Sequence, residues 1–241
     1  MTPDSLFSLQ GRVALVTGGA TGIGKMACYG LAAAGARVLT ASRKAEACHA
    51  AADEINAQGL AGSVEGFGAD ISTEEGIAAL ISEVKHRTDC LHILMNNAGR
   101  TWGAPLGDFP YDGWGKVMDL NVTGMFHLTQ GLIEMLHASS SADDPARVVN
   151  VGSVMGEIPM GDGAYSYAMS KSAVHHMTRI LAKELAERHI TVNALAPGPF
   201  QSGMTKFAIG EDSGADRVGG RVPLGRVGRP EDIAACMQFL C

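Results

Sequence analysis

Short apolar segments alternate along the chain with longer segments in which apolar residues have helical spacing. The short segments are rich in β-branched residues and cover residues 12–19, 37–43, 63–70, 91–99, 146–153 and 190–198. The longer segments cover residues 22–36, 44–57, 72–87, 112–137 and 164–188. Strands that are apolar throughout and separated by helices indicate a parallel sheet covered on both faces. We therefore predict a doubly wound α/β fold, formed as a single domain over residues 1–241.

One long segment departs from this alternation. Residues 199–228 are polar and glycine-rich, with no strand or helix pattern. Irregular segments of this length inside compact domains are commonly functional. We predict a mobile substrate loop there.

Composition narrows the classes of protein to consider. The hydrophobic fraction is 46% and the charged fraction 18%, which is enough apolar material for a large core. The formal charge of −6 argues against nucleic-acid binding, which usually requires a basic excess. The sequence has neither a signal peptide pattern nor an apolar run near the ~20 residues of a membrane span. Its 5 cysteines are scattered and never in C-x-x-C spacing, as expected for reduced thiols. We expect a cytoplasmic protein that binds neither nucleic acid nor membrane.

A glycine cluster, "TGGATGIG" at residues 17–24, lies between the first predicted strand and the first predicted helix. Gly18, Gly22 and Gly24 allow a tight turn and a close approach by a pyrophosphate. The following helix offers free N–H groups and the positive end of its dipole. Open parallel sheets bind ligands at the carboxyl ends of their strands. The cluster therefore predicts a Rossmann-type dinucleotide site, although its spacing is G-x-x-x-G-x-G.

Two tyrosines and a lysine occur together in "AYSYAMSK", residues 164–171. Tyr167 and Lys171 are four residues apart and share a helix face, whereas Tyr165 points about 120° away. Lowering a tyrosine pKa from ~10 to ~7 requires about 4 kcal/mol. One positive charge ~4 Å away supplies that much only in a shielded site. We predict that Tyr167 is a proton donor and Lys171 its cationic partner.

Ser153 ends the fifth predicted strand and should reach the same edge of the sheet. Its hydroxyl can donate to a carbonyl oxygen that Tyr167 protonates, which is general-acid catalysis with an adjacent polarising group. His175 and His176 are adjacent and face different sides of their helix. No cysteine or carboxylate stands near them at ligand spacing, so we expect no metal site.

These motifs occur in order with "NNAG" (96–99), Asn121 in "DLNVTG" and "PG" (197–198). Together they resemble the short-chain dehydrogenase/reductase family. The stretches "NNAGRTWGAPL" (96–106) and "SSADDPARVVNVGSV" (140–154) are most similar to bacterial NADPH-dependent 3-oxoacyl reductases of the rhamnolipid-associated type. The resemblance implies reversible hydride transfer between NADP(H) and a carbonyl or secondary alcohol. It also implies that Lys171 holds the nicotinamide ribose and that Asn121 anchors a water in a proton relay.

The resemblance also implies a set of cofactor contacts. Asp70 and Ile71 would contact adenine, and Pro197 and Gly198 would lead into the nicotinamide region. Ser202 falls where relatives have a threonine that touches the carboxamide. The expected cofactor-binding residues are Thr17, Gly18, Gly22, Ile23, Gly24, Ser42, Arg43, Asp70, Ile71, Asn97, Ala98, Gly99, Tyr167, Lys171, Pro197, Gly198 and Ser202.

Cofactor choice is indicated after the second predicted strand. NAD-preferring proteins carry an acid there that bonds the ribose 2′-hydroxyl. This chain has Ser42-Arg43-Lys44, in which Ser42 takes the acid position and Arg43 can pair with a 2′-phosphate. Thr21 departs from many NADP-binding relatives, which have a basic residue in the glycine loop. We predict NADP(H).

Substrate identity is less constrained. Met155, Met160 and Met169 flank the catalytic residues, and a methionine-lined pocket suits an acyl chain. We therefore expect a 3-oxoacyl thioester, reduced to the 3-hydroxyacyl product. Small alcohols, sugars or cyclic ketones are the alternative substrates. A non-enzymatic NADP-sensing protein is a third interpretation, disfavoured because all four catalytic positions are present.

The carrier of the acyl group is also open. Acyl-carrier protein is acidic and would require a basic patch near the entrance. Lys183 matches one basic position of carrier-protein-specific relatives, but Asp143-Asp144 replaces the other. This replacement is a reason to consider coenzyme A thioesters, or small ketones and alcohols, with acyl-carrier protein kept as a candidate partner.

The family resemblance also bears on assembly. Relatives continue beyond "PEDIAACMQFL" (230–240) with a seventh strand, whereas this sequence stops at Cys241, so either the sequence is incomplete or that strand is absent. That strand contributes to one subunit interface of the family. We expect a homodimer or homotetramer, with the tetramer in doubt.

Overall fold

The computed structural model describes residues 2–160, 163–201 and 214–241. Its centre is a six-stranded sheet in the order β3-β2-β1-β4-β5-β6, in which every neighbouring pair is parallel. The strands are β1 (Val13–Thr17), β2 (Arg37–Ser42), β3 (Ser63–Gly68), β4 (Ile93–Asn96), β5 (Ala146–Val151) and β6 (Ile190–Leu195). The prediction of a doubly wound parallel sheet is confirmed.

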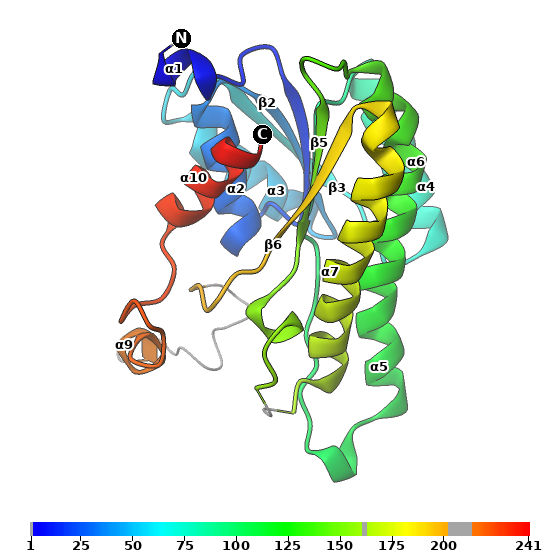
Figure 1. Cartoon of the computed structure of the whole chain (residues 1–241), viewed down its shortest axis with the longest axis vertical. Coiled ribbons are helices and arrows are strands. Elements are labelled where there is room, and N and C mark those ends of the chain that lie inside the picture. The colour runs from blue at the N-terminus through cyan, green and yellow to red at the C-terminus, as the bar shows by residue number, and fades with distance from the viewer. Residues whose placement is uncertain (1, 161–162, 202–213) are drawn as a thin grey trace.

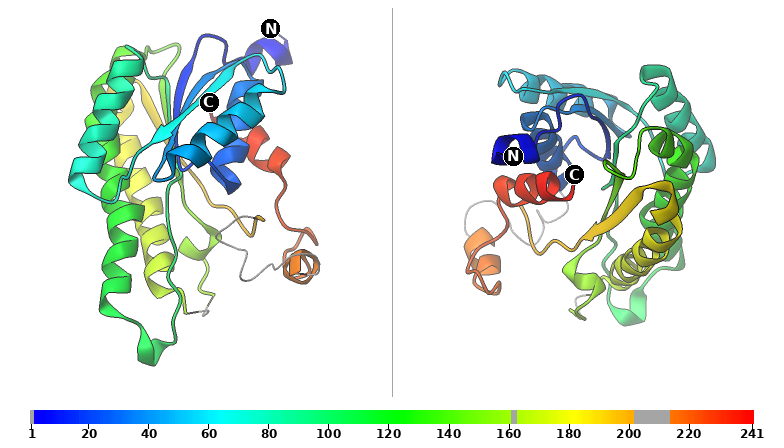
Figure 2. Two further views of the ribbon diagram at one scale, coloured as in Figure 1. Left: turned by 180° about the vertical axis from the view of Figure 1, so that it is seen from behind. Right: turned by 45° about the horizontal axis from the view of Figure 1, so that its top comes forward.

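Helices cover both faces of this sheet, as Figures 1 and 2 show. One layer contains α2 (Gly22–Ala33), α3 (Ala45–Asn56) and α10 (Pro230–Leu240). The other contains α4 (Glu74–Arg87), α5 (Tyr111–Met118), α6 (Met125–Ala138) and α7 (Tyr165–Leu185). The short helices are α1 (Pro3–Leu6), η1 (Leu106–Asp108), η3 (Val154–Gly156), η4 (Ala186–Arg188) and α9 (Gly214–Gly219).

The strands are apolar throughout because both of their faces are buried. On β1, Leu15 packs into the core beneath α4 and α6, while its neighbours Ala14 and Val16 pack into the core beneath α2 and α3. Successive side chains of a strand point to opposite faces, so each layer of helices requires its own apolar set. This explains the lack of polar alternation in the sequence.

The strand order places a switch point between β1 and β4. From β1 the chain proceeds to β2 and β3 on one side, and β4 to β6 lie on the other. The loops that leave β1 and β4 therefore diverge. In sheets of this kind, the crevice at such a point is where ligands bind.

The predicted single helix over 112–137 is wrong in one respect. Between α5 and α6 the chain forms a π-helical segment, η2 (Asp119–Gly124). At Gly124, a Cβ atom would lie 2.1 Å from the carbonyl oxygen of Ile71, so the helix approaches the β3–α4 loop too closely for a side chain. Propensity does not reveal a local widening of this kind, which arises from tertiary packing.

Two described parts of the predicted loop have regular structure. Within the predicted loop 199–228 lie α9 and a bridge between Phe200 and Gly228. Residues 202–213 of that loop lie outside the described residues, so its role stays a prediction. Helix α10 packs against α2, where a Cβ on Gly30 would lie 2.6 Å from Ala234 Cα.

Among the residues that the structure describes, no helix is both long enough and apolar enough to cross a membrane.

Candidate active site

A cavity of about 820 Å³ opens at the carboxyl ends of the strands, and the glycine loop forms one of its walls. Gly18 and Gly22 have backbone φ angles of 70° and 54°, which residues with a side chain rarely adopt. Thr21 caps α2 without a side-chain hydrogen bond, which leaves the first N–H groups of the helix available to a ligand. A cavity of this size with an uncapped helix N-terminus fits a dinucleotide and its pyrophosphate.

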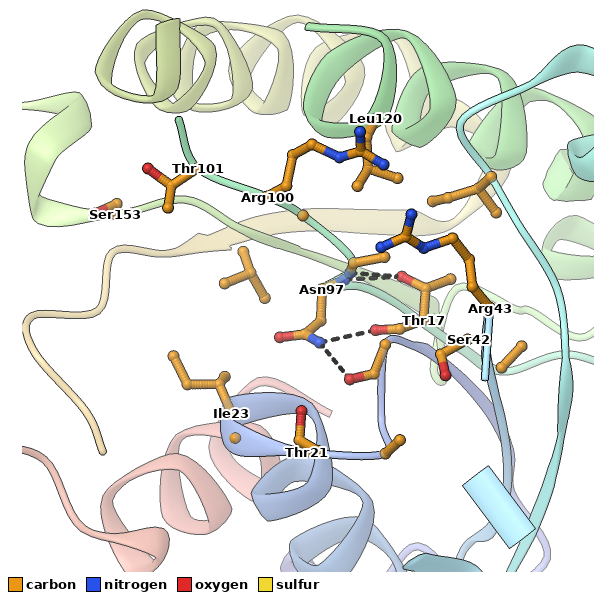
Figure 3. A pocket seen from close by; sticks show the side chains of 18 of the residues that line it. Thr17, Thr21, Ile23, Ser42, Arg43, Asn97, Arg100, Thr101, Leu120 and Ser153 are labelled. Carbon is orange, nitrogen blue, oxygen red and sulfur yellow. Dashed lines mark hydrogen bonds between the residues drawn. The ribbon is translucent and has the colours of Figure 1, made fainter. Parts of the chain in front are cut away.

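Hydrogen bonds across the switch point hold this wall in place. Asn97 Nδ2 donates to the carbonyl oxygens of Thr17 and Gly18, at 2.8 and 3.1 Å. Thr17 Oγ1 accepts from the backbone N–H groups of Asn97 and Ala98, each at 3.0 Å. Figure 3 shows these bonds among the side chains that line the cavity. They tie the end of β1 to the end of β4.

Gly24 serves this arrangement from behind the cavity wall. A Cβ atom there would lie 2.4 Å from both Asn97 Nδ2 and the carbonyl oxygen of Gly18. The third glycine of the motif therefore permits close packing of α2 on the loop.

Two arginines reach the end of the cavity beyond β2. Arg43 lies there as expected, and Figure 3 shows Arg100 at the same end. Burial would raise the pKa of Asp70 in this region, but hydrogen bonds from Ser72 and the charges of Arg43 and Arg100 outweigh it and lower the pKa. Arg100 was not among the site residues predicted from the sequence. Its position directly after "NNAG", at the end of β4, was the available signal.

Ser42 occupies the position where an acid would favour NAD. Its hydroxyl lies 3.0 Å from the Cys48 sulfur. No carboxylate stands at that position to repel a 2′-phosphate.

The proposed catalytic side chains meet at the opposite end of the cavity. Ser153 follows β5, is 6% exposed, and its Oγ accepts from the Met155 N–H at 3.2 Å. Tyr167, in the first turn of α7, shares a side-chain hydrogen bond with Ser153. Lys171 is 5% exposed one turn later, and its Nζ donates to the Val151 carbonyl oxygen at 2.6 Å. The helical spacing of Tyr167 and Lys171 thus directs both toward the end of β5.

The pKa of Tyr167 differs from the sequence-based expectation. Burial raises it, and the hydrogen bond with Ser153 opposes that rise only in part. Lys171 Nζ lies 5.6 Å from the centre of the Tyr167 ring and is directed to a backbone carbonyl. Burial also lowers the pKa of Lys171 to about 8. In the protein alone, Lys171 therefore does not produce the predicted lowering of the tyrosine pKa.

Asn121 lies in the π-helical segment and is 2% exposed. Its side chain accepts from the Arg100 N–H at 2.9 Å and donates to the Arg100 carbonyl oxygen at 3.0 Å. It also donates to Ser170 Oγ at 2.9 Å. A Cβ on Gly99 would lie 3.1 Å from Asn121 Oδ1 and 3.7 Å from Lys171 Nζ, so these groups converge beside Gly99.

Most of the predicted site residues line this one cavity. They are Thr17, Gly18, Gly22, Ile23, Ser42, Arg43, Asp70, Ile71, Asn97, Ala98, Gly99, Ser153, Tyr167, Lys171, Pro197 and Gly198. Gly24 and Asn121 are not among the lining residues and support it through the contacts above. Ser202 lies outside the described residues.

The methionines and charged residues expected near the substrate entrance do not line the cavity. Met160 and Met169 are 59% and 56% exposed, and neither lines the cavity. Lys183 lies twelve residues beyond Lys171 on α7, about 18 Å along the helix. Asp144 precedes β5, at the other end of the sheet from the cavity, and pairs with Arg12 and Arg147. Within one chain, these charged positions therefore do not flank the entrance.

Metal chemistry has no evident ligand set in the described part of the chain. No group of three or more His, Cys, Asp or Glu residues is placed there to hold a metal ion.

Comparisons with known proteins agree with this geometry. A family model described as short chain dehydrogenase matches residues 12–212. The rhamnolipids biosynthesis 3-oxoacyl-[acyl-carrier-protein] reductase of Pseudomonas aeruginosa is 47% identical, over 95% of this chain and 88% of the relative. A tropinone reductase homologue of Arabidopsis thaliana is 34% identical, over 100% of this chain and 89% of its own length. The solved Pseudomonas aeruginosa RhlG/NADP active-site complex superposes with a TM-score of 0.93 at 46% identity, covering 100% of this chain and 92% of that one.

Proposed function

The chain belongs to the short chain dehydrogenase family, and from this premise we propose that it is an NADPH-dependent reductase of 3-oxoacyl thioesters. The observation that carries the proposal is the convergence of Ser153, Tyr167 and the buried Lys171 on the wall of one cavity. The relative that is 47% identical carries the name of a 3-oxoacyl reductase, which supports the choice of substrate.

In this proposal Ser153 and Tyr167 act on one substrate oxygen. The serine hydroxyl donates a hydrogen bond to the carbonyl, and the tyrosine transfers its proton to the oxygen as it gains negative charge. The raised pKa of Tyr167 keeps the phenol protonated at neutral pH, which suits a proton donor in the reducing direction. Bound NADPH supplies the hydride.

Lys171 and Asn121 have supporting roles in the proposed reaction. The Lys171 ammonium stabilises negative charge left on the tyrosine oxygen, because burial reduces screening by water. Asn121 fixes the backbone of Arg100 and the hydroxyl of Ser170, next to Lys171. It is thereby placed to hold a water that returns a proton to the site.

The preference for NADPH rests on charge. Arg43 and Arg100 line the same end of the cavity, where Ser42 replaces an acid. Two guanidinium groups favour a 2′-phosphate over a hydroxyl, because arginine binds phosphate through paired N–H donors. An NADP complex of a 46% identical structure supports this choice.

The decisive experiment compares wild type with Tyr167→Phe, using NADPH and a panel of 3-oxoacyl thioesters, cyclic ketones and sugars. We expect thioesters to give the highest kcat/KM, and the variant to lose at least a thousandfold in kcat while it binds NADPH normally. Full activity in Tyr167→Phe would exclude the mechanism. A preference for cyclic ketones would keep the mechanism and favour the tropinone reductase-like alternative.

The carrier and the assembly belong to the same proposal. Thioesters of coenzyme A and of acyl-carrier protein should be compared in parallel. Lys183 and Asp144, the charged residues on which the choice between these carriers depended, lie far from the cavity in one chain. We also propose that the protein is cytoplasmic and forms a homo-oligomer. Light scattering on the purified protein tests the oligomer.

A further inference from the structure

The mechanism leaves one buried histidine without a role. His175 lies one turn beyond Lys171 on α7 and is 6% exposed. Its Nδ1 is 2.6 Å from Glu157 Oε1, and its Nε2 is 3.3 Å from the backbone nitrogen of Ser153. The ring thus connects the proposed catalytic serine to a carboxylate just beyond η3.

The backbone around Ser153 is shaped to accept this ring. A Cβ atom on Gly152 would lie 1.9 Å from His175 Nε2, and one on Gly156 would lie 2.9 Å from Cε1. Glycine on both sides of the Ser153 turn therefore lets the imidazole pack directly against the main chain. Ser172, also on α7, donates to the Gly156 carbonyl oxygen at 2.7 Å and holds the far end of the same turn.

The two partners determine which nitrogen of the ring carries the proton. A backbone N–H can only donate, so Nε2 must be an unprotonated acceptor. The carboxylate of Glu157 can only accept, so Nδ1 carries the hydrogen. Protonation of Nε2 would place two donors against each other. The arrangement therefore requires a neutral imidazole of the Nδ1–H form.

The trio of Ser153, His175 and Glu157 has the composition of a hydrolase triad but not its geometry. In such a triad the imidazole accepts the hydrogen of the serine hydroxyl. Here it accepts the hydrogen of the serine backbone, while Ser153 Oγ accepts from Met155 N–H and bonds to Tyr167. Among the residues that the structure describes, no base bonds to the hydroxyl, so the trio orients Ser153 and does not turn it into a nucleophile.

We propose that His175 and Glu157 are positioning residues that hold the Ser153 turn so that its hydroxyl faces Tyr167. This inference rests on the proposed reductase function, in which Ser153 polarises the substrate carbonyl. Glu157 sets the tautomer of His175, and His175 sets the direction of the Ser153 N–H. Loss of the His175 or Glu157 side chain would make the Ser153 turn less rigid and leave the glycine loop of the cofactor site unchanged.

Two substitutions of His175 by side chains of similar length distinguish a positioning role from a role in filling space. His175→Gln keeps an acceptor near the Nε2 position, whereas His175→Met fills similar space without one. We expect His175→Met to lower kcat about tenfold, equivalent to ~1.4 kcal/mol, with the Kd for NADPH unchanged. His175→Gln should recover most of this loss. His176→Met is the matched control, because His176 is the exposed neighbour on the same helix.

A third variant guards against simple unfolding of the mutants. The Glu157 side chain is 59% exposed, so Glu157→Leu should fold with a Tm near that of wild type. We expect it to lower kcat severalfold. Equal kcat losses in His175→Gln and His175→Met that follow their Tm values would show a merely structural role. Wild-type kcat in His175→Met would also overturn the proposal.

Two measurements do not depend on turnover and separate this inference from the proposed function. Nitrogen-15 NMR of histidine-labelled protein should show the Nδ1–H form of His175, assigned by its loss in His175→Gln. Amide exchange at Ser153 should be faster in His175→Met than in His176→Met. An Nε2–H tautomer, or unchanged exchange, would refute the positioning even in an active reductase. If both results are as expected but no thioester is reduced, only the proposed function fails.

Discussion

Replacing Lys171 with methionine tests whether the site holds a charge at the expense of stability. Burial lowers the pKa of Lys171 from its ordinary value of 10.5 to about 8. Each pH unit of such a difference corresponds to ~1.4 kcal/mol between the two protonation states. The protonated lysine therefore destabilises the folded protein by about 3 kcal/mol at neutral pH.

The sign of the pH dependence follows from proton binding. Between pH 8 and 10.5 the unfolded chain keeps the lysine proton while the folded protein has released it. Stability rises with pH wherever the unfolded state binds more protons. The destabilisation is complete below pH 8 and disappears as the pH rises toward 10.5. By pH 9.5 about 2 kcal/mol of it should be relieved.

The assay is urea unfolding of cofactor-free protein at pH 7 and at pH 9.5, at one protein concentration. We expect the free energy of unfolding of wild type to rise by about 2 kcal/mol relative to that of Lys171→Met. The comparison between the two pH values cancels the lost hydrogen bond to Val151, which is absent from the variant at both. Lys183→Met, an exposed change on the same helix, should show no such trend. A difference between wild type and Lys171→Met that is the same at both pH values would refute the reasoning.

Three further substitutions test other parts of the site. Arg43→Asp should weaken NADPH binding by about 10- to 100-fold while sparing NADH, because a charged hydrogen bond contributes about 1.5–3 kcal/mol; an unchanged preference in Kd measurements would remove Arg43 from the argument. Gly24→Ala should lower stability by about 1–3 kcal/mol through overpacking and impair cofactor binding, whereas Gly103→Ala, with open space around its Cβ, should be neutral in both thermal melting and titration. Asn121→Ala should leave the Arg100 N–H and carbonyl without their partner and lower both kcat and the free energy of unfolding, the latter by about 2 kcal/mol; normal kinetics would contradict the proposed relay.

Most of the fold could be predicted because its signals are local. Each strand is a short apolar run between glycines or polar turns, and each observed strand lies within its predicted range. Helix α4, predicted over 72–87, begins after Thr73. The Oγ1 of Thr73 accepts from the Gly76 N–H at 3.1 Å, as a helix cap does. The parallel direction of the strands also followed from the sequence, since strands that alternate with helices are joined by crossover connections.

The features that escaped prediction depend on contacts distant in sequence. The π-helical segment around Asn121 is associated with the close approach of Gly124 to Ile71, and the bonds of Asn121 reach Arg100. From the sequence, His175 could be considered only as a metal ligand, because its partners Ser153 and Glu157 are 22 and 18 residues away.

The direction in which the Tyr167 pKa shifts could also not be predicted from the sequence. Helical spacing places Lys171 on the same face, but the direction depends on burial and on where Nζ points. The lysine donates to Val151, which spacing along α7 does not reveal.

The π-helical segment also limits how the gene can tolerate insertions and deletions. The segment closes its turns with i→i+5 bonds and so accommodates one more residue than the same length of α-helix. Loss of one codon within Asp119–Gly124 would therefore allow α5 and α6 to join as a regular helix with little rotation of one against the other. An inserted codon, or a second lost codon, would instead rotate one end by about 100°. If α6 rotated, Leu128 and Leu132, both fully buried, would leave the core. If α5 rotated instead, Val117 would leave its buried position. Single deletions that spare Asn121 should therefore be accepted here more readily than insertions.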